Sequence, residues 1–259
     1  LQAKTEPYFQ GPKWYVSYDA GSGNKEGSPE DPMRDIQDGI DAASEGDTVF
    51  VLPGTYDRSD DLNLEFKNHN DDSPKHIVLM SRGGPDSTII DCGGDETAFD
   101  ISHGTDTTLQ IIGFNIINGW AQDSQNGAAI NIKGYHFGAG DPTHSQAVFK
   151  NCIIEDNDGH GPTVYIEGGM GIFRDCVIRN NRREYDNDGN NPSYEIPGGA
   201  FSVASQNFGD QAGYNIGFLV LDRCKVLSNF IDNSGNPGNT NSGIGVMVNE
   251  GKSIISNSV

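Results

Sequence analysis

Residues 184–195 carry oxygen-bearing side chains at the spacing that calcium-binding loops use. Glu184, Asp186 and Asp188 occupy the first, third and fifth positions, a glycine occupies the sixth, and Glu195 occupies the twelfth. Alternating oxygen ligands let a turning backbone point them at one hard cation. The first position is Glu where such loops carry Asp, and no helical pattern flanks the segment, so a solvated acidic turn is the alternative. Ca²⁺ is the one cofactor that the sequence predicts.

Basic side chains provide the groups that a polysaccharide lyase needs. Such an enzyme removes the proton beside a uronate carboxylate and stabilises the negative charge that develops. The cationic candidates are Lys133, Arg179, Arg182, Arg183 and Lys225, and the proton-transfer candidates are Tyr135, His136, His144 and His160. Ion pairing of the arginines with Glu155, Asp175 or Glu184 is the competing interpretation. No catalytic motif of a known family matches these residues, so the sequence leaves catalysis open.

Aromatic side chains gather in or beside the irregular segments of the chain. The candidates for binding are Trp120, Tyr135, Tyr185, Tyr194 and Tyr214. Exposed aromatic rings stack on sugar rings, which favours a glycan ligand. The same rings could instead pin the loops onto the body of the protein.

The composition excludes several classes of function. The 259 residues include 17 Lys+Arg and 37 Asp+Glu, for a net charge of −20. A chain this acidic is repelled by phosphate backbones, so we expect no nucleic-acid partner. No apolar run approaches the roughly 20 residues that span a bilayer, so we expect no membrane span. High acidity with few lysines favours an extracellular or bacterial cell-surface protein, with an acidic cytosolic protein as the alternative.

Four segments of the chain repeat one pattern of apolar pair, polar corner and alternating strand. The repeated inward position is held by Phe114, Cys152, Cys176 and Cys224, at steps of 38, 24 and 48 residues, and an asparagine or glycine turn follows at 118–119, 157, 180–181 and 229. A second alternating strand recurs at 128–132, 163–166, 199–203 and 244–248. Short strands separated by corners predict an all-β fold, a right-handed parallel β-helix in which like residues stack from coil to coil. The cysteines then form a buried ladder of small apolar residues rather than disulfides or metal ligands.

The segment from Trp14 to Tyr56 has the features of a capped N-terminal end. Residues Met33 to Ser44 place Met33, Ile36, Ile40 and Ala43 on one helical face, which would cover the open first coil. The motifs are Trp14-Tyr15-Val16-Ser17, Asp31-Pro32-Met33-Arg34-Asp35-Ile36-Gln37, Glu45-Gly46-Asp47-Thr48-Val49 and Val51-Leu52-Pro53-Gly54-Thr55-Tyr56.

These motifs resemble the N-terminal module of secreted bacterial right-handed β-helix proteins, including polysaccharide lyases of the alginate lyase and chondroitinase B type. The pattern from Gly113 onward resembles their parallel β-helix repeats. The resemblance implies a fold more than an activity, because one scaffold hosts many functions. We expect an N-terminal extension over residues 1–13, a capping module over 14–60 and β-helix coils over 61–259.

The last residues, 254–259, begin the repeat once more and stop inside a strand. An open coil exposes unpaired strand edges. We therefore expect the β-helix to continue beyond residue 259, or a further domain or subunit to cap it.

Insertions between the repeats indicate where function lies, because regular coils supply only a rigid support. One corner carries the segments 120–126, 182–197 and 230–242, and another carries 133–146 and 206–217. The coil from Cys152 to Cys176 has almost no insertion, so its surface would be a shallow saddle between longer loops, on which an extended polymer could lie. The interpretation we favour is a secreted or cell-surface β-helix module, structural or adhesive, that binds a polysaccharide or cell-surface glycan within a larger assembly. The alternative is a polysaccharide lyase, acting by β-elimination on a uronate-containing polymer, or another carbohydrate-active enzyme. Whether the protein is an enzyme stays open.

Overall fold

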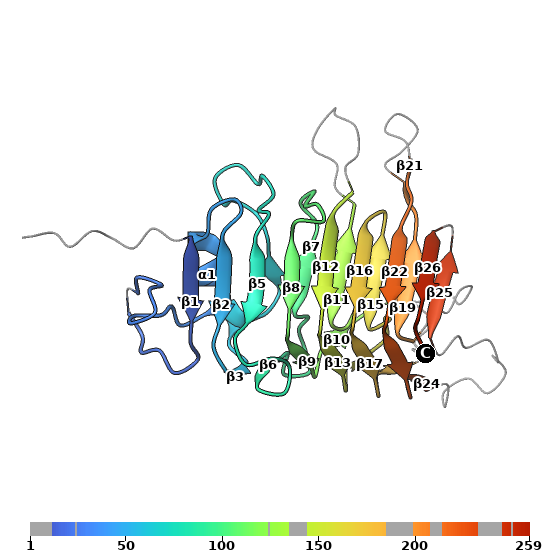
Figure 1. The fold of residues 1–259 in the computed structure, drawn as a ribbon. Helices are drawn as coiled ribbons and strands as arrows, with labels where there is room; N and C mark the ends of the chain where they lie inside the picture. The colour runs from blue at the N-terminus through green and yellow to red at the C-terminus, as the bar shows by residue number, and fades with distance from the viewer. Residues whose placement is uncertain are drawn as a thin grey trace, which may run out of the picture.

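Three long parallel sheets wind around one apolar core in the computed structural model, which describes residues 12–23, 25–123, 125–134, 144–184, 199–207, 214–232, 245–249 and 251–259. In each sheet the strands lie side by side from the N-terminal end to the C-terminal end of the solenoid (Figure 1). Each regular coil runs through sheet A, a tight corner, sheet B, a second tight corner and sheet C. This is the right-handed parallel β-helix that the repeats predict, and that prediction is confirmed.

The strands of each sheet follow one another coil by coil. Sheet A contains β1 (Lys13–Val16), β2 (Thr48–Val51), β5 (Val78–Ser81), β8 (Gln110–Ile112), β12 (Gln146–Lys150), β16 (Met170–Arg174), β22 (Phe218–Asp222) and β26 (Lys252–Ser256). Sheet B contains β3 (Gly54–Tyr56), β6 (Thr88–Asp91), β9 (Asn115–Ile117), β13 (Ile153–Glu155), β17 (Val177–Arg179) and β23 (Lys225–Leu227). Sheet C contains β4 (Leu64–Glu65), β7 (Phe99–Ile101), β11 (Ile130–Lys133), β15 (Val164–Glu167), β19 (Phe201–Ala204) and β25 (Val246–Asn249).

Short strands extend the corner between sheets B and C. They are β10 (Trp120–Ala121), β14 (Asp158–Gly159), β18 (Arg182–Glu184) and β24 (Phe230–Asp232), and we call them the corner strands. A separate antiparallel hairpin joins β20 (Gln206–Asn207) and β21 (Tyr214–Asn215). Among the described residues no helix is long and apolar enough to cross a membrane.

The core consists of side chains that repeat from coil to coil. Phe149 and Phe173 stack with ring centroids 4.8 Å apart, and both rings are fully buried. Cys152, Cys176 and Cys224 form the predicted buried ladder, in which each thiol donates to a backbone carbonyl of the preceding coil. All four cysteines, Cys92 included, are free. The expectation that they pack as small apolar residues rather than form disulfides is confirmed.

A buried ladder of asparagine side chains closes the corner after sheet B. Asn157 donates its amide to Ile116 O at 3.1 Å and to Asn181 Oδ1 at 2.9 Å. Asn181 repeats this pattern one coil later, with donation to Ile154 O at 3.0 Å and to Asn229 Oδ1 at 2.8 Å. Each carbonyl oxygen also accepts a backbone N–H of the coil before it. The ladder therefore satisfies buried polar groups that a turn would otherwise leave unpaired.

The residue before each ladder position has a left-handed backbone. Asn118, Asp156, Asn180 and Ser228 have φ between 52° and 56°, and Gly119 takes the ladder position of the first of these turns. Asn and Asp adopt this conformation more readily than other non-glycine residues. The Asn and Asp residues at these turns are thus a local cause of the sharp corner.

A short helix, α1 (Ile36–Ala42), occupies the first coil between β1 and β2 and packs against both (Figure 1). It is shorter than the predicted helix, but Ile36, Ile40 and Ala43 are buried as expected. Asp61, in the 3₁₀ helix η1 (Ser59–Asp61), accepts the Ile36 N–H at 2.7 Å at its N-terminal end. At the other end Lys75 donates to Ile40 O at 2.9 Å and to Asp41 O at 2.6 Å. Both charges complement the helix dipole.

The last coil leaves apolar side chains in solvent. Ile255 lies in register with the buried Leu221, yet it is 53% exposed. The expectation that a further coil, domain or subunit covers this end stays a prediction.

Replacing Asn181 by Ala is expected to destabilise the fold by about 3 kcal/mol, because it leaves buried donors and acceptors on two neighbouring coils unpaired. Urea unfolding followed by circular dichroism measures this loss. Asn118→Gly is the matched control, since this residue is exposed at the same type of turn and glycine accepts its positive φ; we expect a change of less than about 1 kcal/mol. Equal stability of the two variants would contradict the role given to the ladder.

Asp61 should make stability depend on pH. Burial, the largest cause, raises the pKa of Asp61 from 3.8 to about 6. A raised folded-state pKa means that stability is fully present below about pH 4 and is lost as the pH rises through 6, by roughly 3 kcal/mol. In Asp61→Asn the acceptor for Ile36 remains but the titration disappears. Urea unfolding at pH 4 and pH 7 should show the wild type losing this stability relative to the variant, and an equal pH response in both would refute the assignment.

Candidate functional site

The residue after each ladder position points outward from a corner strand. These residues are Trp120, Asp158, Arg182 and Phe230, at equivalent places in four successive coils. Trp120 pairs in register with Asp158, and Arg182 pairs in register with Phe230. A backbone bond of 2.8 Å from Arg182 N to Asn157 O connects the two pairs. The ladder therefore sets the spacing of this outward row, at about 4.8 Å per coil.

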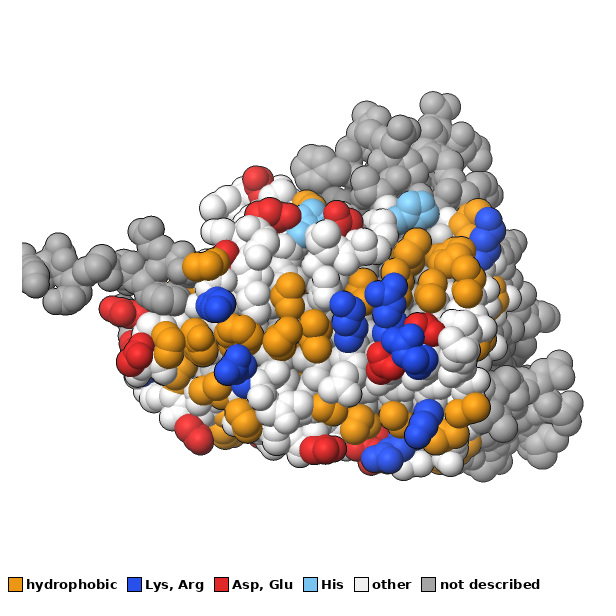
Figure 2. Space-filling model, viewed as in Figure 1, with side chains coloured by type: hydrophobic (Ala, Val, Ile, Leu, Met, Phe, Trp, Pro, Cys, Tyr) orange, Lys and Arg blue, Asp and Glu red, His pale blue; other side chains and the backbone are white. Residues whose placement is uncertain are grey.

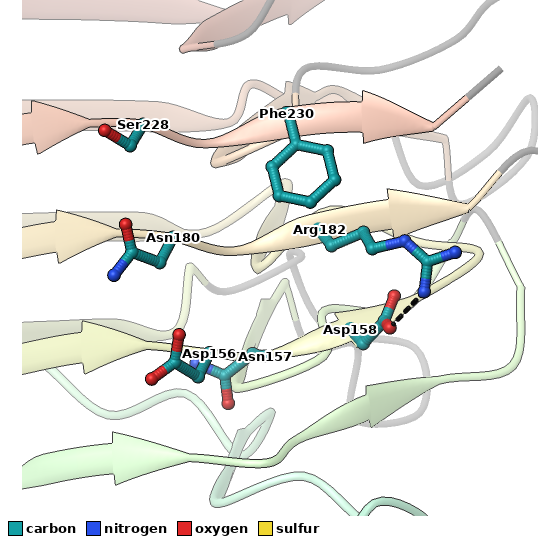
Figure 3. Close-up of a pocket in the computed structure, with 7 residues that line it drawn as sticks. All are labelled: Asp156, Asn157, Asp158, Asn180, Arg182, Ser228 and Phe230. Carbon is teal, nitrogen blue, oxygen red and sulfur yellow. Dashed lines mark hydrogen bonds and ion pairs between the residues drawn. The ribbon is translucent and has the colours of Figure 1, made fainter.

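An open groove of about 560 Å³ lies on this corner of the β-helix. Its lining residues are Asp156, Asn157, Asp158, Asn180, Arg182, Ser228 and Phe230. Figure 3 shows two columns of side chains: the left-handed turn residues form one, and the outward row of the corner strands forms the other. Asp156, Asn157 and Asp158 belong to the coil from Cys152 to Cys176, on which the sequence predicts a shallow saddle.

Arg182 is held by carboxylates on two sides. Its Nη1 lies 2.8 Å from Asp158 Oδ2, and its Nη2 forms an ion pair with Glu184. In Figure 3 the guanidinium turns toward Asp158 and away from Asn180 and Ser228. The side chain is a third exposed, so this pairing orients it more than it stabilises the fold.

Three groove residues have unused hydrogen-bonding capacity. Within the described part of the chain the side chains of Asp156, Asn180 and Ser228 make no hydrogen bond or ion pair, and all three are exposed. Phe230 is 45% exposed above them. The groove thus offers a carboxylate, an amide, a hydroxyl and an aromatic face to a ligand.

Trp120 extends the row beyond the groove. Its ring meets that of His160 edge to face, with centroids 5.4 Å apart. Contact with His160 fixes the indole plane, while the Trp120 side chain stays partly exposed. Of the predicted aromatic candidates, this is the one whose side chain the structure places, and it lies beside the groove.

The other predicted cations do not join Arg182 in one site. Arg179, on sheet B, forms an ion pair with Glu155 at 2.6 Å, as the competing interpretation expected. Arg183 is 4% exposed, and burial lowers its pKa to about 10, so it does not face a ligand on the surface. Lys133, at the end of β11 in sheet C, donates to Asn126 Oδ1 at 2.8 Å and lies 5.9 Å from the Tyr165 ring centre.

Several predicted positions lie outside the described residues. They are Tyr135, Tyr185, Tyr194, Asp186, Asp188 and Glu195. Tyr214 begins β21, and the structure gives its backbone only. Glu184 ends β18 and pairs with Arg182. Among the residues with assigned positions, no group of three His, Cys, Asp or Glu side chains could hold a metal ion, and calcium in the loop 184–195 stays a prediction.

Sequence reasoning missed a pair of cations on the outer face of sheet A. Lys150 and Arg174 lie in register on β12 and β16, and neither forms an ion pair within the described residues. Lys150 donates to Gln110 Oε1 at 2.8 Å. Figure 2 shows basic side chains in the middle of this face beside an apolar band. The repeat alignment contained the signal, since both residues stand two positions before a ladder cysteine.

The outer face of sheet A reverses the charge balance of the whole protein. Its outward strand positions carry four basic residues and one acidic residue, whereas the chain has 17 basic and 37 acidic residues. The five are Lys13, Lys150, Arg174, Lys252 and Asp222. The groove and this face therefore differ in charge.

Comparisons with known proteins bear on the fold alone. The chain matches no protein-family model and no curated protein. Among solved structures it is similar to a rhamnogalacturonan lyase, with a TM-score of 0.55 and 16% identity over 96% of this chain and 56% of that one. It is also similar to pectin methylesterases from carrot (TM-score 0.38, 12% identity, 98% of this chain and 73% of that one) and from Erwinia chrysanthemi (TM-score 0.41, 13% identity, 95% and 78%). The chain thus spans little more than half the length of the lyase, with which it shares the parallel β-helix fold.

Proposed function

We propose that this protein is a carbohydrate-binding β-helix module and that the groove at the corner strands is its glycan site. The observation that carries the proposal is the outward row: Asp158, Arg182 and Phe230 line one open groove, and Trp120 continues the row one coil further. An aromatic face with nearby amide, hydroxyl and carboxylate groups is the surface that a sugar ring and its hydroxyl groups need.

The shape of the site favours a polymer over a small molecule. Three coil spacings separate Trp120 from Phe230, which is about 14 Å along the solenoid axis. A ligand that reaches both rings must be extended in that direction. Side chains on a rigid parallel sheet hold their spacing without a ligand, so little ordering cost opposes binding.

The resemblance of the fold to a protein named rhamnogalacturonan lyase supports a carbohydrate ligand. The structural or adhesive role, the place in a larger extracellular assembly and the extracellular or bacterial cell-surface location remain parts of this proposal. So does Ca²⁺ in the loop 184–195, where Glu184 would have to exchange its ion pair with Arg182 for the metal.

Removing the aromatic faces tests the proposal. Titration calorimetry with a panel of oligosaccharides should find binding that Phe230→Ala and Trp120→Ala each weaken about tenfold. Leu227→Ala is the matched control, because Leu227 is 42% exposed on β23 and lies outside the groove. Binding that responds equally to Phe230→Ala and Leu227→Ala, or no binding of any oligosaccharide, would refute a glycan site here.

The second candidate function is β-elimination on a uronate-containing polymer, and the pair Lys150–Arg174 favours it. A lyase needs a cation that is available to stabilise the charge developing beside a carboxylate. Arg179 and Arg182 form ion pairs with carboxylates, whereas Lys150 and Arg174 form none among the described residues, although Asp222 lies in register with Arg174 on the next strand. Arg174 would bind the uronate carboxylate, and the neutral amine of Lys150 would be the base that takes the proton beside it.

The ultraviolet absorbance of unsaturated sugars follows such a reaction. On a cleaved polyuronate we expect Lys150→Ala and Arg174→Ala each to lower the rate at least about a hundredfold. Lys225→Ala, an exposed cation on β23, is the control and should keep the wild-type rate. Cleavage that survives Lys150→Ala, or no cleavage of any polyuronate in the panel, would exclude this mechanism.

A further inference from the structure

We infer that the groove at the corner strands selects glycans that carry no anionic group. This inference rests on the proposed glycan site and gives the chemical class of its ligand. It separates the groove from the uronate polymers that a lyase would use.

Among the described residues that line the groove, the one basic side chain already has two anionic partners. Arg182 contacts Asp158 and Glu184, so a ligand carboxylate would have to displace one of them and leave that carboxylate unpaired. Exchange of one carboxylate for another at the same cation brings little gain in free energy. Recognition of an anion normally uses a guanidinium whose donors are free for a bidentate contact.

The second carboxylate of the groove faces the ligand without a partner. Asp156 is exposed and makes no hydrogen bond or ion pair among the described residues. The cation in its vicinity, Arg179, is itself bound to Glu155. At the dielectric constant of water, a ligand anion about 5 Å from Asp156 would be repelled by roughly 1 kcal/mol. The net charge of the chain would add to this repulsion.

Hydroxyl groups fit the same surface well. Asp156 accepts hydrogen bonds, Asn180 both donates and accepts, and Ser228 does the same, so each neighbouring sugar hydroxyl finds a complementary group. Phe230 supplies the apolar face beside them. Each of these contacts is available without an ionic group on the ligand.

The outer face of sheet A shows how basic residues are arranged elsewhere on this fold. Lys150 and Arg174 lie in register and form no ion pair among the described residues, whereas Arg182 in the groove lies between two carboxylates that it contacts. The charge of the groove is thus a local property and not a consequence of the net charge of −20 alone.

Matched neutral and uronate oligosaccharides of equal length test this selectivity. Titration calorimetry at low salt would compare uncharged hexasaccharides (cello-, xylo-, manno- and malto-hexaose) with hexagalacturonate. We expect at least one neutral hexasaccharide to bind in a way that Phe230→Ala abolishes, and Phe230-dependent binding of hexagalacturonate to be at least tenfold weaker.

The variant Asp156→Asn tests how much the negative charge of Asp156 contributes to this selectivity. Asparagine accepts the left-handed backbone of this position and keeps an acceptor, so neutral binding should change less than about threefold. Affinity for hexagalacturonate should rise about threefold to fivefold, and added salt should remove the difference. Asp60→Asn, an exposed carboxylate in η1, is the control and should change neither affinity.

The possible outcomes separate this inference from the proposed function. Phe230-dependent binding of hexagalacturonate that equals or exceeds neutral binding would overturn the inference and leave the glycan site standing. An unchanged hexagalacturonate affinity in Asp156→Asn would also overturn it. If no hexasaccharide binds in a Phe230-dependent way while the variants keep the wild-type melting temperature, the glycan site itself is wrong.

Discussion

The hydrogen-bonded ladder of Asn157, Asn181 and Asn229 is the interaction on which the rest of this part of the molecule depends. The amides of Asn157 and Asn181 each join their own coil to both neighbours, the amide of Asn229 bonds to the coil before it, and all three are buried where water could not replace them. The ladder fixes the register of successive coils at one corner. A shift of one residue would bury the outward row and expose the buried amides together, so function and folding are coupled at this point.

The backbone geometry of that corner determines much of which side chains line the groove. The residue before each ladder position must tolerate a positive φ, which favours the small polar side chains Asp156 and Asn180. The residue after it must point outward, which leaves its type free for function. In the last of these coils the residue before the ladder position is Ser228 and the residue after it is Phe230. The short polar side chains of the first column are thus a consequence of the repeated turn, whereas the turn fixes only the outward direction of the second column.

Charge is distributed unevenly over an acidic chain. Ion pairs between neighbouring coils engage Arg179 and Arg182, and Arg223 bridges Asp175 and Asp222. On the outer face of sheet A, Lys150 and Arg174 form no ion pair among the described residues, although Asp222 lies in register with Arg174. Two surfaces of different charge therefore lie on one rigid support, so binding of charged and of uncharged polymers can be tested separately on each.

The repeat made much of this architecture predictable. Alignment of Cys152, Cys176 and Cys224 located the core ladder and the asparagine turns, and with them the fold class and the corner that carries the groove. Two features could not be foreseen. The contact of Arg182 with Asp158, beyond the expected pairing with Glu184, depends on side-chain distances, and the contacts of α1 with Asp61 and Lys75 join residues far apart in sequence. Lys150 and Arg174 were visible in the alignment as equivalent residues of adjacent coils, but that neither forms an ion pair among the described residues depends on side-chain distances.

Hydrogen–deuterium exchange with and without a neutral hexasaccharide that binds tests the central claim most directly, because it reports where a ligand lies. The account predicts slower exchange in the segments 156–158, 180–182 and 228–230, which line the groove, and unchanged exchange in β12 and β16. Protection confined to β12 and β16, or spread evenly over the solenoid, would contradict it.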